Sequence, residues 1–213
     1  MLDAGRLTLN NYSVGGMYAT TPLLELTDEA IRAHMLVDFE ADVCKPFPFL
    51  PCLTAIPSRP VKALKLTIPL LPPSAAFRAT IPYLLTQNNP TSTWTVCSGA
   101  QGDLGTHPAP AMSQGALFSF CTAAARELAG TNVRFNETYL FYRVEVDAEA
   151  EAHGVMKASD FARMYERILE RPEIAGCRVR VEGFGDLDEV RFEDLLVLSR
   201  DMERRAREMG MAK

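Results

Sequence analysis

Apolar side chains recur with a helical period in two segments of the chain. In residues 159–171, five of them follow the i, i+3, i+4, i+7, i+8 spacing that places side chains on one face of a helix: Phe161, Met164, Tyr165, Ile168 and Leu169. Pro172 ends this pattern because proline cannot continue a helix. In residues 27–40 an apolar residue recurs at every fourth position after Thr27, which is suited to cap the first turn. Both segments are therefore predicted to be amphipathic helices.

Three other segments have the composition of strands. Residues 91–98 are rich in β-branched side chains and lie between Pro90 and Gly99. Residues 177–182 alternate apolar and polar positions, and residues 132–146 are rich in β-branched and aromatic side chains. We expect each of the three to be extended.

The intervening segments complete an alternating order. Residues 112–129 predict a helix with Ser113 as its N-cap, and residues 190–209, rich in Arg and Glu, predict a final solvated helix. Residues 99–111 are expected to form a loop because of their Gly and Pro content. Strands that alternate with helices favour an α/β fold with a doubly wound parallel sheet.

One segment, residues 42–75, fits neither pattern. Eight of the fourteen prolines fall between Pro46 and Pro73, which excludes a long helix or a central strand. The helical pattern that ends at Ala41 resumes at Phe77. We therefore predict a Pro-rich irregular insertion within one domain.

Composition excludes several classes of protein. The chain has 213 residues, of which 47% are hydrophobic and 23% charged, as in soluble globular domains. A net charge of −5 argues against a nucleic-acid surface, and the sequence has no apolar run long enough to span a membrane. The first residues contain no apolar segment typical of a secretory signal, so a cytoplasmic location is expected. Five scattered cysteines without a CxxC pair, and three histidines far apart in sequence, indicate reduced thiols and no metal site.

An ordered set of short phrases identifies a family resemblance. Thr95-Val-Cys-Ser98 ends a strand, Ala125-Arg-Glu-Leu128 ends a helix and Val133-Arg-Phe-Asn136 begins the next strand. Together with the segment Gly16–Glu29, these phrases resemble the C-terminal two-thirds of the short-chain dehydrogenase/reductase family. The resemblance covers residues 10–41 and 77–182. It implies a Rossmann-like sheet in a single, N-terminally truncated domain over residues 1–213.

The resemblance also implies a function. Members of the family use NAD or NADP to oxidise or reduce a carbonyl or alcohol of a small molecule. By its position, Ser98 would hold the substrate oxygen, and Asp38 falls near the family's structural and catalytic Asn. Pairing of subunits into a homo-oligomer through the family's helix-packing surface is a further expectation, with no nucleic-acid or membrane partner.

The family's proton-transfer pair and its glycine-rich loop are missing. Residues 84–138 contain no Tyr and residues 66–156 contain no Lys, so the Tyr-x-x-x-Lys motif is absent in any register. The triplet of glycines at 99, 102 and 105 follows a strand, but His107-Pro-Ala-Pro110 is expected to follow it in place of a helix, which argues against a phosphate cradle. Asn10-Asn11 and Gly15-Gly16 resemble the family's segment near the adenine.

Three hypotheses therefore stand. The chain is a divergent NAD(P)-dependent oxidoreductase, or a catalytically inactive binding or partner protein of the same family. A third hypothesis makes it a piece of a longer protein in which residues 42–75 come from an unremoved intron. Under each of them Trp94, Tyr139 and Tyr142 are expected to be packing residues, and Cys97 and Cys121 buried thiols.

Overall fold

The fold is centred on one five-stranded sheet. The computed structural model describes residues 9–10, 20–35 and 73–211. Within them the strand order is β1-β2-β3-β6-β7. The bounds are β1 (Leu9–Asn10), β2 (Thr93–Gly99), β3 (Arg134–Leu140), β6 (Cys177–Val181) and β7 (Arg191–Asp194). The first four strands are parallel and β7 is antiparallel to β6, so the predicted Rossmann-like, mostly parallel α/β sheet is confirmed.

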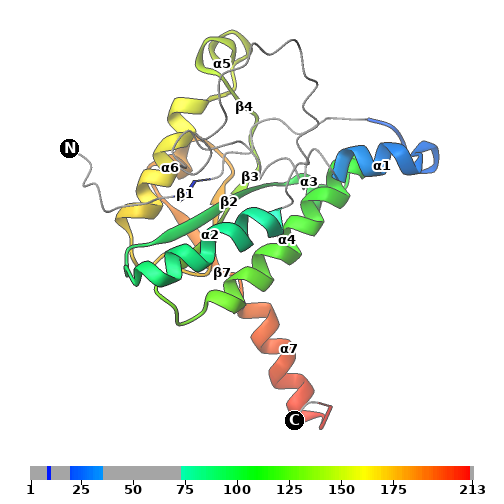
Figure 1. Cartoon of the computed structure of the whole chain (residues 1–213). Helices are drawn as coiled ribbons and strands as arrows, with labels where there is room; N and C mark the ends of the chain where they lie inside the picture. Colours follow the sequence, from blue (N-terminus) through cyan, green and yellow to red (C-terminus); the bar gives the residue numbers. More distant parts are fainter. Residues whose placement is uncertain (1–8, 11–19, 36–72, 212–213) are drawn as a thin grey trace, which may run out of the picture.

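Helices cover this sheet on two faces (Figure 1). One apolar core joins β2 and β3 to α2 (Pro73–Gln87) and α4 (Pro108–Leu128), and a second joins β6 to α6 (Ala158–Glu170). Successive strand residues point to opposite faces, so Val96 lies in the first core and Cys97 in the second. Because of this alternation, a side chain at the end of a strand lies under the helices of one face of the sheet and not of the other.

Four aromatic side chains fill the first core. The rings of Trp94 and Phe135 are stacked with centroids 5.4 Å apart, and Phe77 and Phe120 meet them edge to face. Trp94 and Phe135 are 3% and 1% exposed. Trp94 is therefore a core residue, as expected from its strand.

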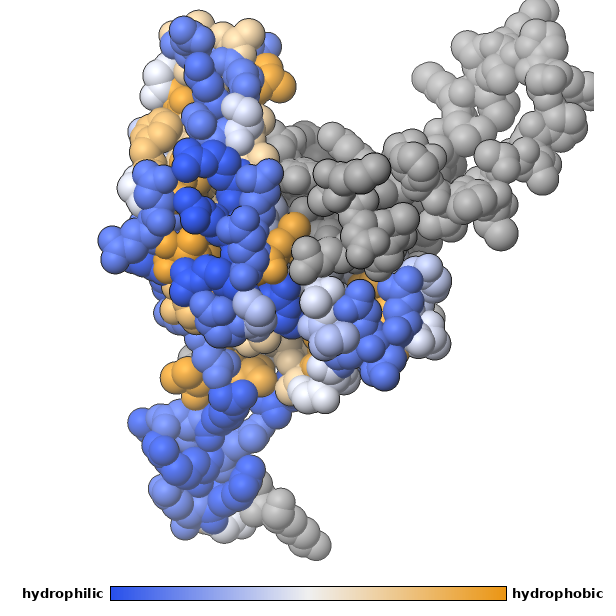
Figure 2. All heavy atoms as spheres, turned by 90° about the vertical axis from the view of Figure 1, so that its left-hand side faces the viewer, coloured by the Kyte–Doolittle hydropathy of each residue, from blue (hydrophilic) through white to orange (hydrophobic). Residues whose placement is uncertain are grey.

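Shorter elements connect these layers. They are η1 (Leu23–Glu25), α1 (Asp28–His34), α3 (Gln101–Leu104), β4 (Val144–Glu145), α5 (Asp147–His153), β5 (Met156–Lys157), η5 (Phe184–Leu187) and α7 (Val197–Glu208). The Thr27 hydroxyl accepts a hydrogen bond from the Ala30 amide at 3.2 Å, which confirms it as the cap of α1. Helix α7 projects away from the rest of the fold (Figure 1). The side of α7 that Figure 2 shows is mostly hydrophilic. Among the described helices, none is both long and apolar enough to cross a membrane.

Two expected helix starts were wrong. Helix α4 begins at Pro108 and not near residue 112, because a proline suits the first helical position, where its missing amide has no intrahelical acceptor. Ser113 is consequently inside the helix, and its hydroxyl donates to the Pro110 carbonyl at 2.9 Å. Helix α2 begins at Pro73, so residues 73–75 of the expected insertion are helical.

The start of the expected final helix was also wrong. Residues 191–194 form strand β7, because their backbone groups pair with the free edge of β6, and α7 follows only from Val197. Residues 42–72 of the insertion and Asp38 lie outside the described residues.

Two glycines test how closely α3 packs against α4. A Cβ atom at Gly102 would lie 2.3 Å from the Phe118 ring, whereas a Cβ at Gly115 would meet nothing within 4 Å. We expect Gly102→Ala to lower the free energy of unfolding by about 1–3 kcal/mol through overpacking. Gly115→Ala in the middle of α4 should raise it by about 0.5–1 kcal/mol, because Gly weakens a helix relative to Ala. Urea melts followed by circular dichroism compare the two, and equal effects would contradict the close contact.

Candidate functional site

Ser98 stands at the carboxyl end of β2, where the resemblance predicted it. It is the penultimate residue of the strand and is 2% exposed. Its hydroxyl donates a hydrogen bond to Oε1 of Glu137 on β3 at 2.5 Å. Ligands of doubly wound folds bind outside the carboxyl ends of the parallel strands, so this pair marks the candidate site.

Glu137 is a fully buried carboxylate held from two sides. Its Oε2 accepts a hydrogen bond from Nε of Arg178 on β6 at 2.9 Å, and the Glu137 side chain is 0% exposed. Burial raises the pKa of the Glu137 carboxyl, while the Arg178 guanidinium and the Ser98 hydroxyl oppose that rise. Since Ser98 donates to Oε1 and Arg178 to Oε2, both oxygens of Glu137 accept a hydrogen bond, as a buried carboxylate requires.

Arg178 is held in turn by aromatic rings. Its guanidinium carbon lies 4.5 Å from the centroid of the Phe118 ring and 5.2 Å from that of Tyr139. The Arg178 side chain is 15% exposed. A planar guanidinium suits this position because it stacks on rings while it donates to a carboxylate in its plane.

Cys121 of α4 closes the same group of side chains. It is 0% exposed, and burial, followed by the nearby Glu137 carboxylate, raises the pKa of its thiol well above the ordinary value. A thiol that resists ionisation is a poor nucleophile. Cys97 is also buried, so the expectation of buried thiols is confirmed for both.

Tyr139 is next to Ser98 in the register of β2 and β3. It is 4% exposed. Burial, together with a hydrogen bond to Asp103, raises the pKa of Tyr139 to about 12. A catalytic Tyr base needs a lowered pKa, so Tyr139 does not replace the missing Tyr of the family.

The raised pKa of Tyr139 predicts a loss of stability in alkali. Because the folded-state pKa is about 12 and the ordinary value is 10.0, the free energy of unfolding should fall as the pH rises from 10.0 towards 12. Below that range this tyrosine should contribute no pH dependence. Urea melts at stepped alkaline pH test this, with Tyr139→Phe as the control that removes the component. An unchanged slope in the control would contradict the assignment.

Two of the glycines at the end of β2 and in α3, Gly99 and Gly102, contact side chains of α4. The Gly99 amide donates to Oε1 of Gln114 at 2.6 Å, and Gly102 makes room for the Phe118 ring. A helix does follow Gly105, contrary to expectation, but these contacts bind β2 and α3 to α4 and do not form a phosphate cradle. This glycine-containing segment therefore does not fit the diphosphate of a dinucleotide.

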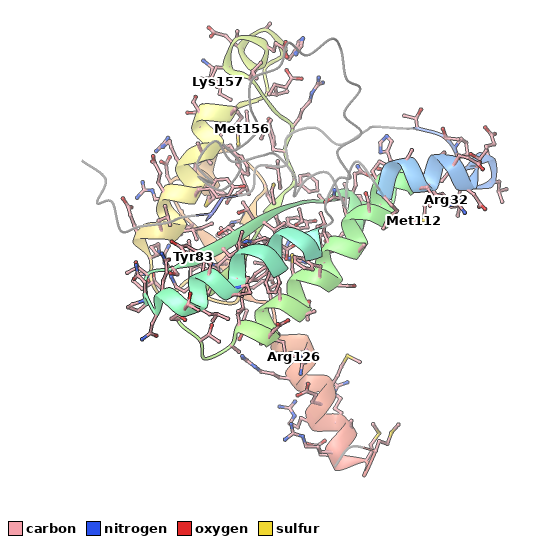
Figure 3. All side chains as sticks on the ribbon, in the orientation of Figure 1. Arg32, Tyr83, Met112, Arg126, Met156 and Lys157 are labelled. Carbon is pink, nitrogen blue, oxygen red and sulfur yellow. The ribbon has the colours of Figure 1, made fainter. Side chains whose placement is uncertain are left out.

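No tyrosine–lysine pair replaces the missing motif among the described residues. Figure 3 labels Tyr83 on α2 and Lys157 on β5, which are separate elements. The Tyr83 hydroxyl accepts from Gln87, and the Lys157 ammonium donates to Glu151 at 3.2 Å. No cluster of possible metal ligands occurs in the described part of the chain either.

Large apolar side chains are exposed after each of the three strands β2, β3 and β6. Leu104 is 48% exposed, Phe141 51% and Phe184 48%. The Phe184 ring meets that of Tyr142 edge to face at 5.3 Å, which accounts for the packing expected of Tyr142. Each of these three strands is thus followed in the chain by an exposed apolar side chain.

Sequence reasoning found Ser98 but missed Glu137 and Arg178. A signal for both was present, because an acidic residue interrupts the strand at 134–140 and Arg alternates with Val in the strand at 177–181. Charges inside predicted central strands of one sheet must pair with each other when they face the same side.

Comparison with known proteins identifies the family. No family model matches the chain. The chain is 43% identical over 186 residues to the short-chain dehydrogenase/reductase iacG of Pestalotiopsis fici, and the match covers 85% of this chain. It spans 62% of that relative, which is less than two-thirds of the relative's length. On this identity, which agrees with the parallel sheet and with the position of Ser98, the chain belongs to the short-chain dehydrogenase/reductase family.

Proposed function

We propose that this chain is part of an NAD(P)-dependent oxidoreductase that acts on a carbonyl or alcohol of a small molecule. The observation that carries the proposal is the position of Ser98 at the carboxyl end of β2, with its hydroxyl held by Glu137. The 43% identity to a short-chain dehydrogenase/reductase supports it. In this function Ser98 contacts the reacting oxygen of the substrate, and Glu137 and Arg178 fix the orientation of its hydroxyl.

Support for the dinucleotide comes from the family alone. The segment after β2 does not fit it, because Gly99 and Gly102 contact side chains of α4, and Lys157, the one described lysine, pairs with Glu151. We therefore propose no role in hydride transfer for any described residue.

A second candidate function is a catalytically inactive member of the family that binds a small molecule or a partner chain. The observation in its favour is the absence of Tyr from residues 84–138 and of Lys from residues 66–156. Tyr139, the aromatic hydroxyl nearest to Ser98 in the strand register, has a pKa raised to about 12 and cannot take over the role of the base.

Binding and turnover separate the two functions. The full chain is melted with and without saturating NADH and NADPH, because a ligand of the folded state raises the midpoint, by about 2.7 kcal/mol at a hundredfold excess over its dissociation constant. Turnover is then measured from nicotinamide absorbance with a panel of aldehydes, ketones and secondary alcohols. A shifted melt with turnover that Ser98→Ala abolishes supports the oxidoreductase. A shifted melt without turnover supports the inactive binder, and no shift with either dinucleotide overturns NAD(P) dependence.

A further inference from the structure

Helix α5 is held to the rest of the fold mainly by polar contacts. Ala150 is its one buried residue, and all the others are exposed. The helix packs against β4, β5 and α6, and it lies at the top of the view in Figure 1. A segment with so few buried apolar side chains opens locally with only a small rise in free energy. The polar contacts of α5 therefore decide how often it leaves its place.

One of these contacts joins the end of α5 back to β4. Nδ1 of His153, the last residue of the helix, lies 2.6 Å from Oε2 of Glu145. The Glu145 side chain is 11% exposed, and its other oxygen pairs with Arg143. The hydrogen bond from His153, helped by the charge of Arg143, lowers the pKa of the Glu145 carboxyl. Glu145 therefore stays ionised in neutral and weakly acidic solution, and Nδ1 of His153 is the donor to it.

The other polar contacts of α5 keep their charge between about pH 5 and pH 8. Oδ1 of Asp147 accepts a hydrogen bond from the Ser159 amide at 3.0 Å, and hydrogen bonds from Ser159 lower the pKa of the Asp147 carboxyl. Lys157 of β5 donates to Glu151 at 3.2 Å. The remaining charged groups on α5 and at the near ends of its neighbours are carboxyl and guanidinium groups, which ordinarily titrate outside this range: Arg143, Glu149 and Asp160. Among the described groups around α5, His153 is thus the one of a type that changes charge there.

We propose that His153 is a proton-operated latch, which holds α5 on β4 in weakly acidic solution and releases it as the pH rises. The charged imidazole pairs with the ionised Glu145 carboxylate. It also lies at the carboxyl-terminal end of α5, where the helix dipole favours a positive charge. Loss of one imidazole proton removes both charge interactions and leaves at most a neutral hydrogen bond.

The latch acts on the segment that follows the candidate site in the chain. Strand β3, which carries Glu137, ends at Leu140, and β4 and α5 come directly after it. A change of pH therefore alters the order of this segment and leaves the buried pairs of the sheet in place. The inference does not depend on the proposed function, because it concerns the opening of α5 and neither binding nor turnover.

Three variants isolate the charge at the latch. His153→Gln is neutral at every pH, Glu145→Gln removes the negative partner, and His153→Arg keeps a positive charge at position 153 throughout. The matched control is His107→Gln, which removes an imidazole that precedes α4 and lies 3.1 Å from Thr106.

Hydrogen exchange of the full chain, read by mass spectrometry on peptides that cover α5, measures how often the helix opens. The exchange rate at each pH is divided by the intrinsic chemical rate of the same peptide, so that only structural opening remains. In the wild type and in His107→Gln, we expect the protection of α5 to fall roughly 3- to 10-fold from about pH 5.5 to about pH 8, the scale of one partly exposed ion pair and one charge at a helix end.

The three latch variants should behave differently from the wild type. His153→Gln and Glu145→Gln should show low protection of α5 at every pH, and His153→Arg should keep the high protection throughout. Peptides from the buried strand β3 should stay protected in every variant, which shows that the fold is intact.

Three results would overturn the proposal. They are a protection of α5 in the wild type that is constant or rises with pH, a pH dependence that persists in folded His153→Gln or Glu145→Gln, and low protection near the upper end of the pH range in folded His153→Arg. Failure of the proposed function is distinct, because it is read from the melts with NADH and NADPH and from turnover.

Discussion

Replacement of Phe135 with Ala is expected to lower the free energy of unfolding by about 3–5 kcal/mol, the range for loss of a large aromatic side chain from a core. Phe135 is 1% exposed and lies against three other aromatic rings, including the stacked Trp94 at 5.4 Å. These rings come from β2, α2 and α4, so the cavity cannot close without moving three elements. Urea melts give the size of the effect, and fluorescence of Trp94, which is the one tryptophan in the chain, reports on the site itself.

Phe192→Ala is the control for this prediction. Phe192 lies on β7 and is 38% exposed, with the Arg171 guanidinium 5.2 Å from its ring centroid. We expect a loss below about 1 kcal/mol, since surface replacements rarely cost more. Similar losses for Phe135 and Phe192 would show that the aromatic group is not the centre of the core.

Arg178→Met is expected to have an effect of similar size, about 3–5 kcal/mol, for a different reason. The change keeps most of the side-chain volume but leaves the carboxylate of Glu137, which is 0% exposed, without its charged partner. Removing one member of a buried ion pair costs more than the pair contributes, because the other charge stays out of water. Urea melts at neutral pH measure the loss.

Arg163→Met provides the comparison for Arg178. Arg163 pairs with Asp188 at 3.0 Å, but the two side chains are 45% and 74% exposed, so water replaces the lost partner. The expected loss is below about 1 kcal/mol. If Arg178→Met cost no more than this, Glu137 would have to be neutral in the folded protein.

The elements with a strict period could be predicted from the sequence. The apolar spacing from Phe161 to Leu169 matches α6, and the alternation in residues 177–182 matches β6. The start of α4 could not be recognised, because Pro108 occurs as readily in a loop as at the first position of a helix. Strand β7 was missed because its residues pair with an edge that exists only once β6 is in place.

The candidate site, too, could be predicted from the sequence only in part. The segment Thr95-Val-Cys-Ser98 was sufficient to predict Ser98 at the end of a strand. Its hydrogen-bond partner Glu137, however, is 39 residues away in the chain. Their contact depends on the register of β2 against β3, which pairs Val96 with Glu137 and Ser98 with Tyr139. A one-residue slip of that register would turn Glu137 towards the opposite face, and no local pattern specifies such a register.

Strand β7 has a further consequence for the protein in concentrated solution. A parallel sheet that ended at β6 would present a flat row of free amides and carbonyls to which another chain could add a strand. With β7 in place, the outermost strand carries Arg191 and Glu193, whose side chains are each 51% exposed, beside Asp194. Alternating charges on an edge strand oppose strand addition, because a second chain would have to bury them. This short strand therefore protects the edge of the sheet from edge-to-edge aggregation.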